Sequence, residues 1–209
     1  CAESLLRSGL SYITIVDCDK ISLSNINRQI QATSKTIGLS KTTALKSRLL
    51  DINPDAKIME ICELYNKENH EKFEIHKYDY IIDCIDSLSN KINLIREASK
   101  LDSVFLSSMG ASLKIDPTRV RVGKFWDIKG CPFAAIIRKR IRKGELPAKD
   151  FYCVYSDEVI ENSSILPDLD SEGNKSLYKK AIINGTIAHI TAIFGFTLAG
   201  IVIKDICEK

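Results

Sequence analysis

The sequence contains no pair of cysteines at C-x-x-C spacing, although seven of its 209 residues are cysteines. An odd number of cysteines without such pairs disfavours a disulfide scaffold and indicates reduced thiols in an intracellular compartment. We expect the cytoplasm, with a mitochondrial or membrane-associated location as alternatives. Cys18, Cys62 and Cys84 lie in or beside apolar runs, where cysteine acts as a small hydrophobic residue, and we expect them to be structural.

Internal repeats are absent too, and the composition has no strong bias. Hydrophobic residues make up 44% of the chain and charged residues 27%, which disfavours disorder and collagen-like structure. This length is enough for one sizeable core and too short for several ordinary domains. We therefore predict one globular domain.

The sequence does not begin with Met. Cys1 leads directly into a helical pattern over residues 2–8 that Gly9 closes. We therefore expect a fragment that begins inside a structural element, with its own N-terminus and any targeting signal outside this sequence.

Apolar runs alternate with helical patterns along the first half. The runs predict strands and the patterns predict helices, in the order strand 12–16, helix 41–50, strand 58–64, strand 78–82, helix 91–101 and strand 104–107. Uniformly apolar strands that are separated by helices indicate a parallel sheet covered on both faces. The predicted fold class is therefore α/β, doubly wound and Rossmann-like.

The second half differs in composition. We predict a short strand at 120–122, a basic helix at 132–143, an acidic loop at 150–180 and an apolar helix within the uncharged stretch 181–203. This stretch is long enough to span a bilayer, but its polar residues and glycines favour a buried or interface helix over a membrane anchor.

Polar side chains follow two of the predicted strands. In a doubly wound sheet the ligand binds at the carboxyl ends of the strands. Asp17 stands where nucleotide-binding folds hold ribose, although a cap or turn former is the alternative. Asp83 and Asp86 follow a later strand. Asp86 is a candidate ligand for Mg²⁺ beside phosphate, whereas Asp83 is a candidate cap of the following backbone.

A loop after the first strand contains Asn25, Arg28 and Gln29, and Lys41 follows at the start of a helix. Cations suit a polyphosphate because they stabilise charge on a leaving group. The alternative is a solvated loop. Lys41 is poorly placed for the helix dipole, since a cation is unfavourable in the first turn, and this favours a functional role.

The predicted helix at 132–143 is densely basic. Residues 114–149 contain eleven basic and three acidic residues, a net charge of +8 within a chain of net charge +3. A polyanion such as tRNA and a merely solvated face are both open alternatives. The candidate binding residues are Arg138, Lys139, Arg140, Arg142 and Lys143.

Four motifs follow one another along the chain: ITIVDCDKISLSNINRQ, GLSK, DYIIDCIDS and SSMGASLKIDPTRVRV. In this order they resemble the MoeB/ThiF superfamily of ATP-dependent adenylating enzymes, which is related to ubiquitin-activating enzymes. The second half is similar to one branch, the tRNA threonylcarbamoyladenosine dehydratases (TcdA/CsdL-like). The segments that carry this likeness are SSMGA before DPTR, CPFAAIIRKRIRK, CVYSDE and GTIAHITAIFGF.

The resemblance implies a role for each candidate. Asp17 would hold the ribose of ATP, Asn25 and Arg28 would contact its phosphates beside Gln29, Lys41 would lie on the phosphates, and Asp86 would bind Mg²⁺. Residues 1–124 would form the ATP-binding adenylation region, with the glycine-rich phosphate loop of the family lying before Cys1. Residues 125–209 would form the substrate, tRNA and interface region of the same domain.

The resemblance also implies a reaction and partners. A substrate carboxylate would attack ATP, and the adenylate would then cyclise with net loss of water. A homodimer is implied, a cysteine desulfurase or sulfur-acceptor system is a further candidate partner, and the missing C-x-x-C pairs imply no zinc. Cys131 and Cys153 are candidate relay thiols, but we interpret both as structural.

Three other functions stay open. An activator of a ubiquitin-like or sulfur-carrier protein would share the adenylation site, yet it would need zinc cysteines or a thioester cysteine domain, and neither is visible. A catalytically silent RNA- or protein-binding relative would keep the basic helix. A dehydrogenase is disfavoured because hydride transfer needs no stabilisation of a pyrophosphate leaving group.

Overall fold

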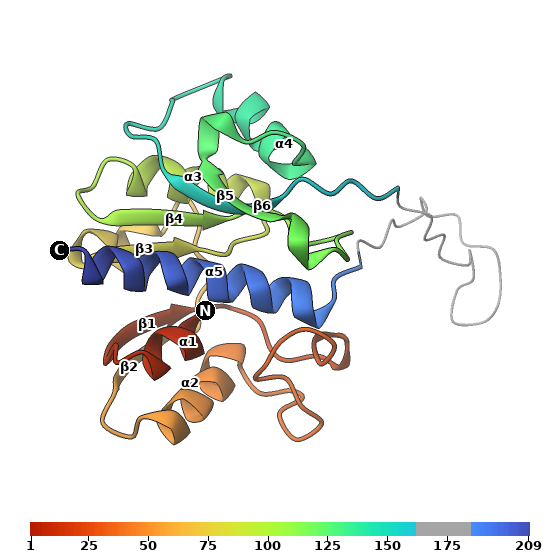
Figure 1. The fold of residues 1–209 in the computed structure, drawn as a ribbon. Coiled ribbons are helices and arrows are strands. Elements are labelled where there is room, and N and C mark those ends of the chain that lie inside the picture. The colour runs from red at the N-terminus through yellow and green to blue at the C-terminus, as the bar shows by residue number, and fades with distance from the viewer. Residues whose placement is uncertain (162–184) are drawn as a thin grey trace.

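A computed structural model of the protein describes residues 1–161 and 185–209, in which six strands form two sheets (Figure 1). The two-stranded sheet pairs β1 and β2 in parallel. The four-stranded sheet has the order β3-β4-β6-β5, parallel except for β5. The strands are β1 (Tyr12–Val16), β2 (Lys57–Ile61), β3 (Tyr80–Asp83), β4 (Val104–Ser108), β5 (Val120–Lys124) and β6 (Tyr152–Ser156).

Five α-helices and five short 3₁₀ helices connect and cover these strands in the described residues. The α-helices are α1 (Ala2–Arg7), α2 (Lys41–Ile52), α3 (Leu88–Ala98), α4 (Pro132–Ile141) and α5 (Ala188–Cys207). The 3₁₀ helices are η1 (Leu23–Asn25), η2 (His70–Phe73), η3 (Ile75–Lys77), η4 (Pro117–Arg119) and η5 (Phe125–Asp127).

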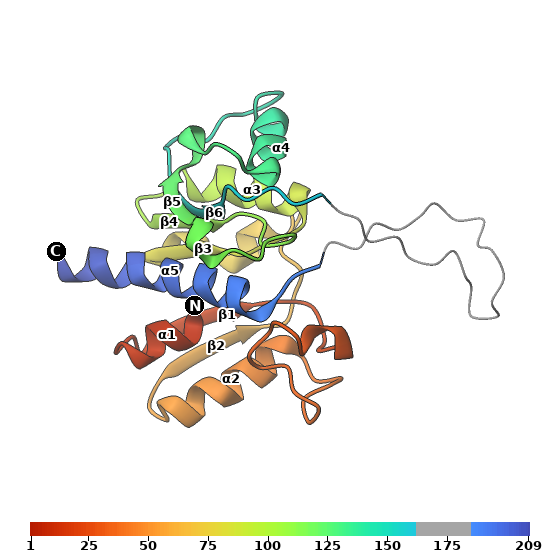
Figure 2. The same cartoon turned by 45° about the vertical axis from the view of Figure 1, so that its right-hand side comes forward.

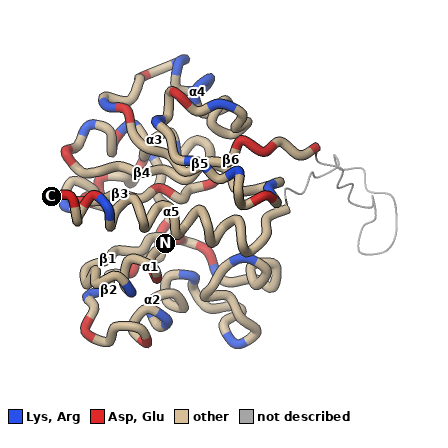
Figure 3. The backbone as a smooth tube through the Cα atoms, in the orientation of Figure 1, with Lys and Arg blue, Asp and Glu red and all other residues tan. Residues whose placement is uncertain are grey.

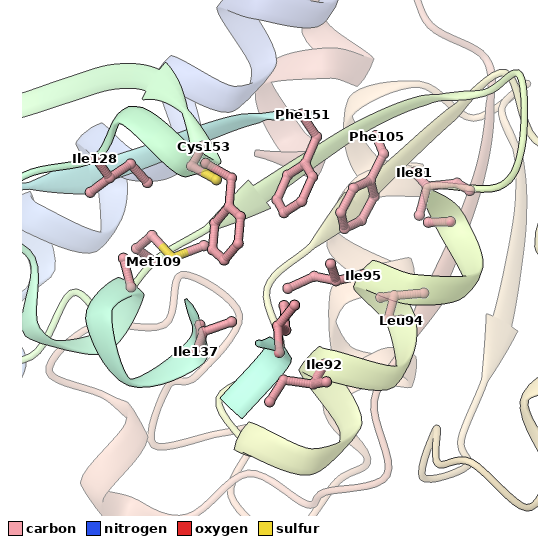
Figure 4. Close-up of a cluster of buried hydrophobic side chains, with 14 of the residues drawn as sticks. Ile81, Ile92, Leu94, Ile95, Phe105, Met109, Ile128, Ile137, Phe151 and Cys153 are labelled. Carbon is pink, nitrogen blue, oxygen red and sulfur yellow. The ribbon is translucent and has the colours of Figure 1, made fainter. Parts of the chain in front are cut away.

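The four-stranded sheet has a core on each face, which confirms the doubly wound, mostly parallel α/β prediction. On one face, Phe105 of β4 and Phe151, which precedes β6, pack against Ile95 of α3 and Ile137 of α4 (Figure 4). On the other face, Leu106 and other strand residues pack against α5, which crosses the molecule beside α1 (Figure 2). Burial of both faces explains the apolar runs in β3 and β4.

The apolar C-terminal helix is part of this core. Ile190, Phe194, Leu198 and Val202 recur at helical spacing and are buried. The helix is long and apolar enough to cross a membrane by length and composition alone, but this stripe packs on the sheet. The predicted stretch 181–203 begins outside the described residues, and the observed helix continues past it to Cys207.

Several predicted boundaries were wrong. The strand predicted at 58–64 ends at Ile61, and the helix predicted at 91–101 is shifted to Leu88–Ala98. The predicted loop at 150–180 contains β6, whereas residues 162–184 lie outside the described part of the chain. β6 is short and lies at the start of the predicted acidic stretch, so it gave no strand signal, yet it forms the buried link between β4 and β5.

The single parallel sheet that the sequence predicts is interrupted between β1 and β3. Within the described residues each of these two strands has a partner on one edge only. Side chains of both strands line one cavity of about 500 Å³. We call the gap between the free edges of β1 and β3 the interstrand slot.

Candidate active site

The carboxyl ends of β1 and β3 open onto two adjoining cavities. The smaller one, of about 500 Å³, has Asp17 and Lys41 in its wall. The larger one, of about 1140 Å³, has Arg28 in its wall. The two cavities share four lining residues, which are Gln29, Cys84, Ile85 and Asp86. Because the two cavities share this wall, one molecule that fills both would contact Asp17 and Lys41 in the smaller cavity and Arg28 in the larger one.

Lys41 begins α2 and lies between two carboxylates. Its Nζ is 2.6 Å from Asp19 Oδ2 and 3.7 Å from Asp17 Oδ2. The hydrogen bond from Lys41 lowers the pKa of Asp19, although partial burial opposes the shift. The negative charges of these carboxylates compensate for the unfavourable interaction between the Lys41 ammonium group and the dipole of α2. The Lys41 side chain is only 11% exposed, so this pairing keeps an ammonium group in the wall of the smaller cavity.

Asp17 follows β1 and forms the turn that its alternative interpretation predicts. Its Oδ1 accepts a 2.9 Å hydrogen bond from the backbone N–H of Asp19. The carboxylate still faces the smaller cavity with 40% of the side chain exposed. A turn-forming role and a ligand-binding role therefore coexist in this residue.

The loop around η1 places its candidate residues differently. Asn25 is buried, and its Oδ1 accepts a hydrogen bond from the N–H of Ser22 in a capping box. Arg28 lines the larger cavity and donates to Ser24 O at 2.7 Å and to Asn27 Oδ1 at 2.8 Å. Arg28 and Gln29 thus reach the cavity walls, whereas Asn25 lines neither cavity and holds the loop.

Asp83 and Asp86 have different surroundings. Asp83 is fully buried, and its Oδ2 lies 2.7 Å from Lys91 Nζ and accepts a 2.6 Å hydrogen bond from Ser107 Oγ. Its Oδ1 accepts a bond from the N–H of Ile85, as expected for a cap. Asp86 is exposed, lines both cavities, and forms no hydrogen bond or ion pair in the described part of the chain. Of these two residues, only Asp86 has a carboxylate available for a cation.

The wall of the larger cavity opposite the η1 loop comes from residues 108–114. Leu113 in this segment has a φ of +56°, a left-handed conformation that costs a non-glycine residue about 1–3 kcal/mol. The N–H of Leu113 donates to the carbonyl of Gly185 at 2.9 Å. The strain is thus held by a contact with the segment before α5, at a position that borders the cavity.

This wall is held in place by hydrogen bonds between two of the motifs that carry the family resemblance. Glu158 Oε2 accepts hydrogen bonds from the N–H groups of Ile115 and Asp116. Arg119 donates to the carboxylate and to the carbonyl of Asp157, and this pairing lowers the pKa of Asp157. Segments DPTR and SDE therefore form one structural unit beside the cavity.

The basic helix α4 lies at an outer edge of the molecule, and Lys and Arg continue along its C-terminal end (Figure 3). Two of its five candidate cations have partners within the protein. Arg138 donates to Phe125 O at 2.9 Å, and the Arg142 guanidinium lies 5.5 Å from the ring centre of Trp126. The other three are exposed without an ion pair among the described residues, and these are Lys139, Arg140 and Lys143.

The cysteines divide in an unexpected way. Cys131 and Cys153 are buried, which agrees with the structural interpretation, and burial raises the pKa of the Cys153 thiol. We expected Cys18, Cys62 and Cys84 to be structural, as small hydrophobic residues of apolar runs, but all three are exposed. Each follows an apolar strand, but it lies just past the buried part, where the chain turns toward a cavity or the solvent.

Sequence reasoning missed several residues of this region. Lys91 and Lys114 are both buried, and Lys114 lines the larger cavity and donates to the carbonyl of Glu158. A lysine is rarely buried, so the sequence around Lys91 and Lys114 did not indicate that their side chains are buried. The signal that was available was the motif SSMGASLK, whose small residues after a strand leave room for a cavity.

Comparison with known proteins gives a consistent result over the whole length. The ThiF family profile matches residues 1–209. The tRNA threonylcarbamoyladenosine dehydratase of Bacillus subtilis is 31% identical, over 99% of this chain and 82% of that protein. The E. coli enzyme of the same name, solved in complex with AMP, is 28% identical with a TM-score of 0.82, covering 99% of this chain and 80% of that one. A second E. coli structure contains ATP and has the same TM-score at 27% identity, covering 99% of this chain and 80% of that one. The chain belongs to the ThiF family.

Proposed function

We propose that this chain catalyses the ATP-dependent dehydration of threonylcarbamoyladenosine in tRNA through an acyl-adenylate. One observation carries the proposal: Asp17, Lys41, Gln29 and Asp86 surround two adjoining cavities at the carboxyl ends of the strands. This is where a doubly wound sheet binds a nucleotide. The full-length similarity to dehydratases, one of them in complex with ATP, supports this substrate and this reaction.

The chain's own residues would divide the nucleotide among them. Asp17 would accept hydrogen bonds from the ribose, because its carboxylate faces the smaller cavity. Lys41 would exchange part of its contact with Asp19 for the phosphates. Arg28 and Gln29 would contact the phosphates from the larger cavity, whereas Asn25 would act mainly by holding the loop that carries them.

The donor set at the shared wall fits Mg²⁺. Mg²⁺ in nucleotide sites is held by one or two carboxylates together with phosphate oxygens and water. Asp86 supplies one carboxylate without a protein partner in the described residues, and Asp83 is fully engaged. Bound there, the ion would neutralise negative charge on the phosphates.

The reaction has two steps. A carboxylate oxygen of the threonyl group attacks the α-phosphorus of ATP, the bond to the bridging oxygen breaks, and pyrophosphate leaves. Arg28 and Lys41 stabilise the charge that develops on the phosphates. A nitrogen of the modified base then attacks the activated carbonyl carbon and loses its proton, and AMP leaves with one of the original carboxylate oxygens, so the cyclic product has lost one water overall. The closure is intramolecular, which favours it through proximity.

The remaining substrate would lie along the second half of the chain. We assign residues 1–124 to nucleotide binding and residues 125–209 to the substrate, with the exposed cations of α4 contacting tRNA phosphates. Because β6 lies between β4 and β5, both regions share one sheet and form a single unit. Phosphate contacts by Lys and Arg provide affinity without base readout.

A homodimer in a reducing compartment, the cytoplasm, completes the proposal. All seven cysteines are unpaired in the structure, which suits such a compartment. The apolar Phe196 of α5 lines the larger cavity and is 58% exposed, and contact with a second protomer would cover it. Light scattering at micromolar concentration distinguishes a dimer from a monomer.

Nucleoside mass analysis tests the reaction. Threonylcarbamoyl-modified tRNA is incubated with ATP, Mg²⁺ and the protein, digested, and analysed for an ATP-dependent loss of the mass of water. Exchange of pyrophosphate into ATP without a change in tRNA mass would instead favour a protein substrate. Absence of both reactions would favour a silent binding protein.

A further inference from the structure

Lys91 is a charged residue with no solvent contact. It belongs to α3, and its side chain is 0% exposed, as is that of its partner Asp83. An ion pair with both members buried usually contributes little net stability, since apolar residues of similar size would often do as well. Stability alone therefore does not account for a charged pair at this position.

The contacts of the pair converge on one short stretch of backbone. The Lys91 ammonium lies 2.7 Å from Asp83 Oδ2 and donates a 3.0 Å hydrogen bond to the carbonyl of Ile85. Asp83 Oδ1 accepts a 2.9 Å bond from the N–H of Ile85, and Ser107 donates to Oδ2 at 2.6 Å. Both backbone polar groups of Ile85 are thus bound by the two members of the ion pair.

These contacts fix the peptide group that joins Ile85 to Asp86. The carbonyl of Ile85 and the N–H of Asp86 belong to the same planar peptide unit. Binding of that carbonyl by Lys91 sets the orientation of the plane, and binding of the Ile85 N–H by Asp83 sets the residue before it. The exposed carboxylate of Asp86 therefore projects from a backbone that is held from inside the protein.

The geometry points to Lys91 as a positioning residue that, with Asp83, holds Asp86 ready for the metal ion of the nucleotide. This inference rests on the proposed function, in which Asp86 is the metal ligand. Outer-shell groups that orient a metal ligand typically contribute 10- to 100-fold to metal affinity. We therefore expect the ion pair to affect the metal requirement, while ATP binding without metal depends on other residues.

The test uses the full chain and a charge-free double variant, Asp83→Asn with Lys91→Met. This variant removes the charges together and leaves neither one buried alone. The measurement is calorimetric ATP binding, first in EDTA and then over a series of free Mg²⁺ concentrations. We expect near wild-type affinity in EDTA and about a 10- to 100-fold rise in the Mg²⁺ concentration that gives half of its effect.

The matched control removes another ion pair. Glu60→Gln with Lys46→Met deletes a contact between β2 and α2 that touches neither cavity. Its Mg²⁺ dependence should equal that of the wild type. A folded Asp83→Asn/Lys91→Met variant with wild-type Mg²⁺ dependence overturns the positioning role.

Two further variants keep the outcomes separable. Asp86→Asn should abolish the Mg²⁺ effect, and if it does not, the proposed metal site itself is wrong. Should the double variant fail to fold, Ser107→Ala decides, because it keeps both charges and removes one hydrogen bond to Asp83. A rise of about threefold or more in the Mg²⁺ requirement supports the inference, and an unchanged requirement overturns it.

Discussion

The side-chain amide of Asn27 donates a 2.8 Å hydrogen bond to the backbone carbonyl of Thr186, 159 positions later in the sequence. Thr191 Oγ1 donates to the carbonyl of Arg28, and Ser112 and Thr186 hydroxyls are in contact at 3.4 Å. The η1 loop, the wall of the larger cavity and the start of α5 are thus tied together. A change in any one of these three segments should therefore alter the position of Arg28.

Replacement of Lys41 by Met should raise the pKa of Asp19 toward its ordinary value. The wild-type pKa is lowered chiefly by the hydrogen bond from Lys41, while Cys18 adds a weaker contact. A lowered carboxylate pKa stabilises the fold above the unfolded-state pKa, and this contribution is lost as the pH falls through the folded-state pKa. The stability difference between wild type and variant should therefore shrink on acidification. Carboxylate titration by NMR and denaturation at several pH values measure both effects. An Asp19 pKa that is the same in the variant and the wild type would contradict the ion pair.

Replacement of Asp86 by Ala should lower adenylation about 100- to 1000-fold, because a group that stabilises charge in the transition state is lost. The fold should be unaffected, since Asp86 is exposed and bonds to no other described residue. Pyrophosphate exchange measures the rate, and circular dichroism checks the fold. Asp102→Ala is the control, because it removes an exposed carboxylate that borders neither cavity. Normal turnover in the Asp86 variant would rule out its assigned role.

Charge reversal of Lys139, Arg140 and Lys143 should weaken tRNA binding and make it less dependent on salt. These are the cations of α4 and its C-terminal end that have no ion pair in the described residues. Each lost phosphate contact should reduce the slope of log K against log salt by about 1. Filter binding at several salt concentrations gives the slope. Reversal of the exposed Lys67, Lys72 and Lys77, which lie before, in and at the end of the η2–η3 segment, is the control, and an equal effect there would show that only net charge matters.

Leu198→Ala should lower the free energy of unfolding by about 2–5 kcal/mol, whereas Phe196→Ala should lower it by less than about 1 kcal/mol. Leu198 of α5 is buried against the sheet, and Phe196 lies on the exposed face. Urea denaturation gives both values. Similar losses at the two positions would mean that α5 does not pack on the sheet through the observed stripe.

The alternation of strands and helices was predictable because it depends on local apolar patterns. β1 has the predicted bounds, and β4 and α2 begin at the predicted residues. Asp17 and Asp86 could be chosen for a similar reason, since the residues after an apolar strand reach the ligand-binding edge of a parallel sheet.

Long-range pairing and burial of charge could not be predicted in this way. β6 owes its place to neighbours on both sides rather than to its own five residues. Lys91 is buried because Asp83 and the Ile85 carbonyl neutralise and bind it, and those partners are visible only in three dimensions. Asn25 looked like a ligand-binding amide, but its carbonyl is used within the loop.

The interstrand slot gives the chain a property apart from catalysis. Within the described residues, β1 pairs only with β2 and β3 only with β4, and both strands line one shared cavity. Such a pair of edges can template the addition of an extended peptide, whether a short synthetic strand or a segment of a neighbouring copy. A strand that paired with both edges would join the two sheets into one continuous sheet.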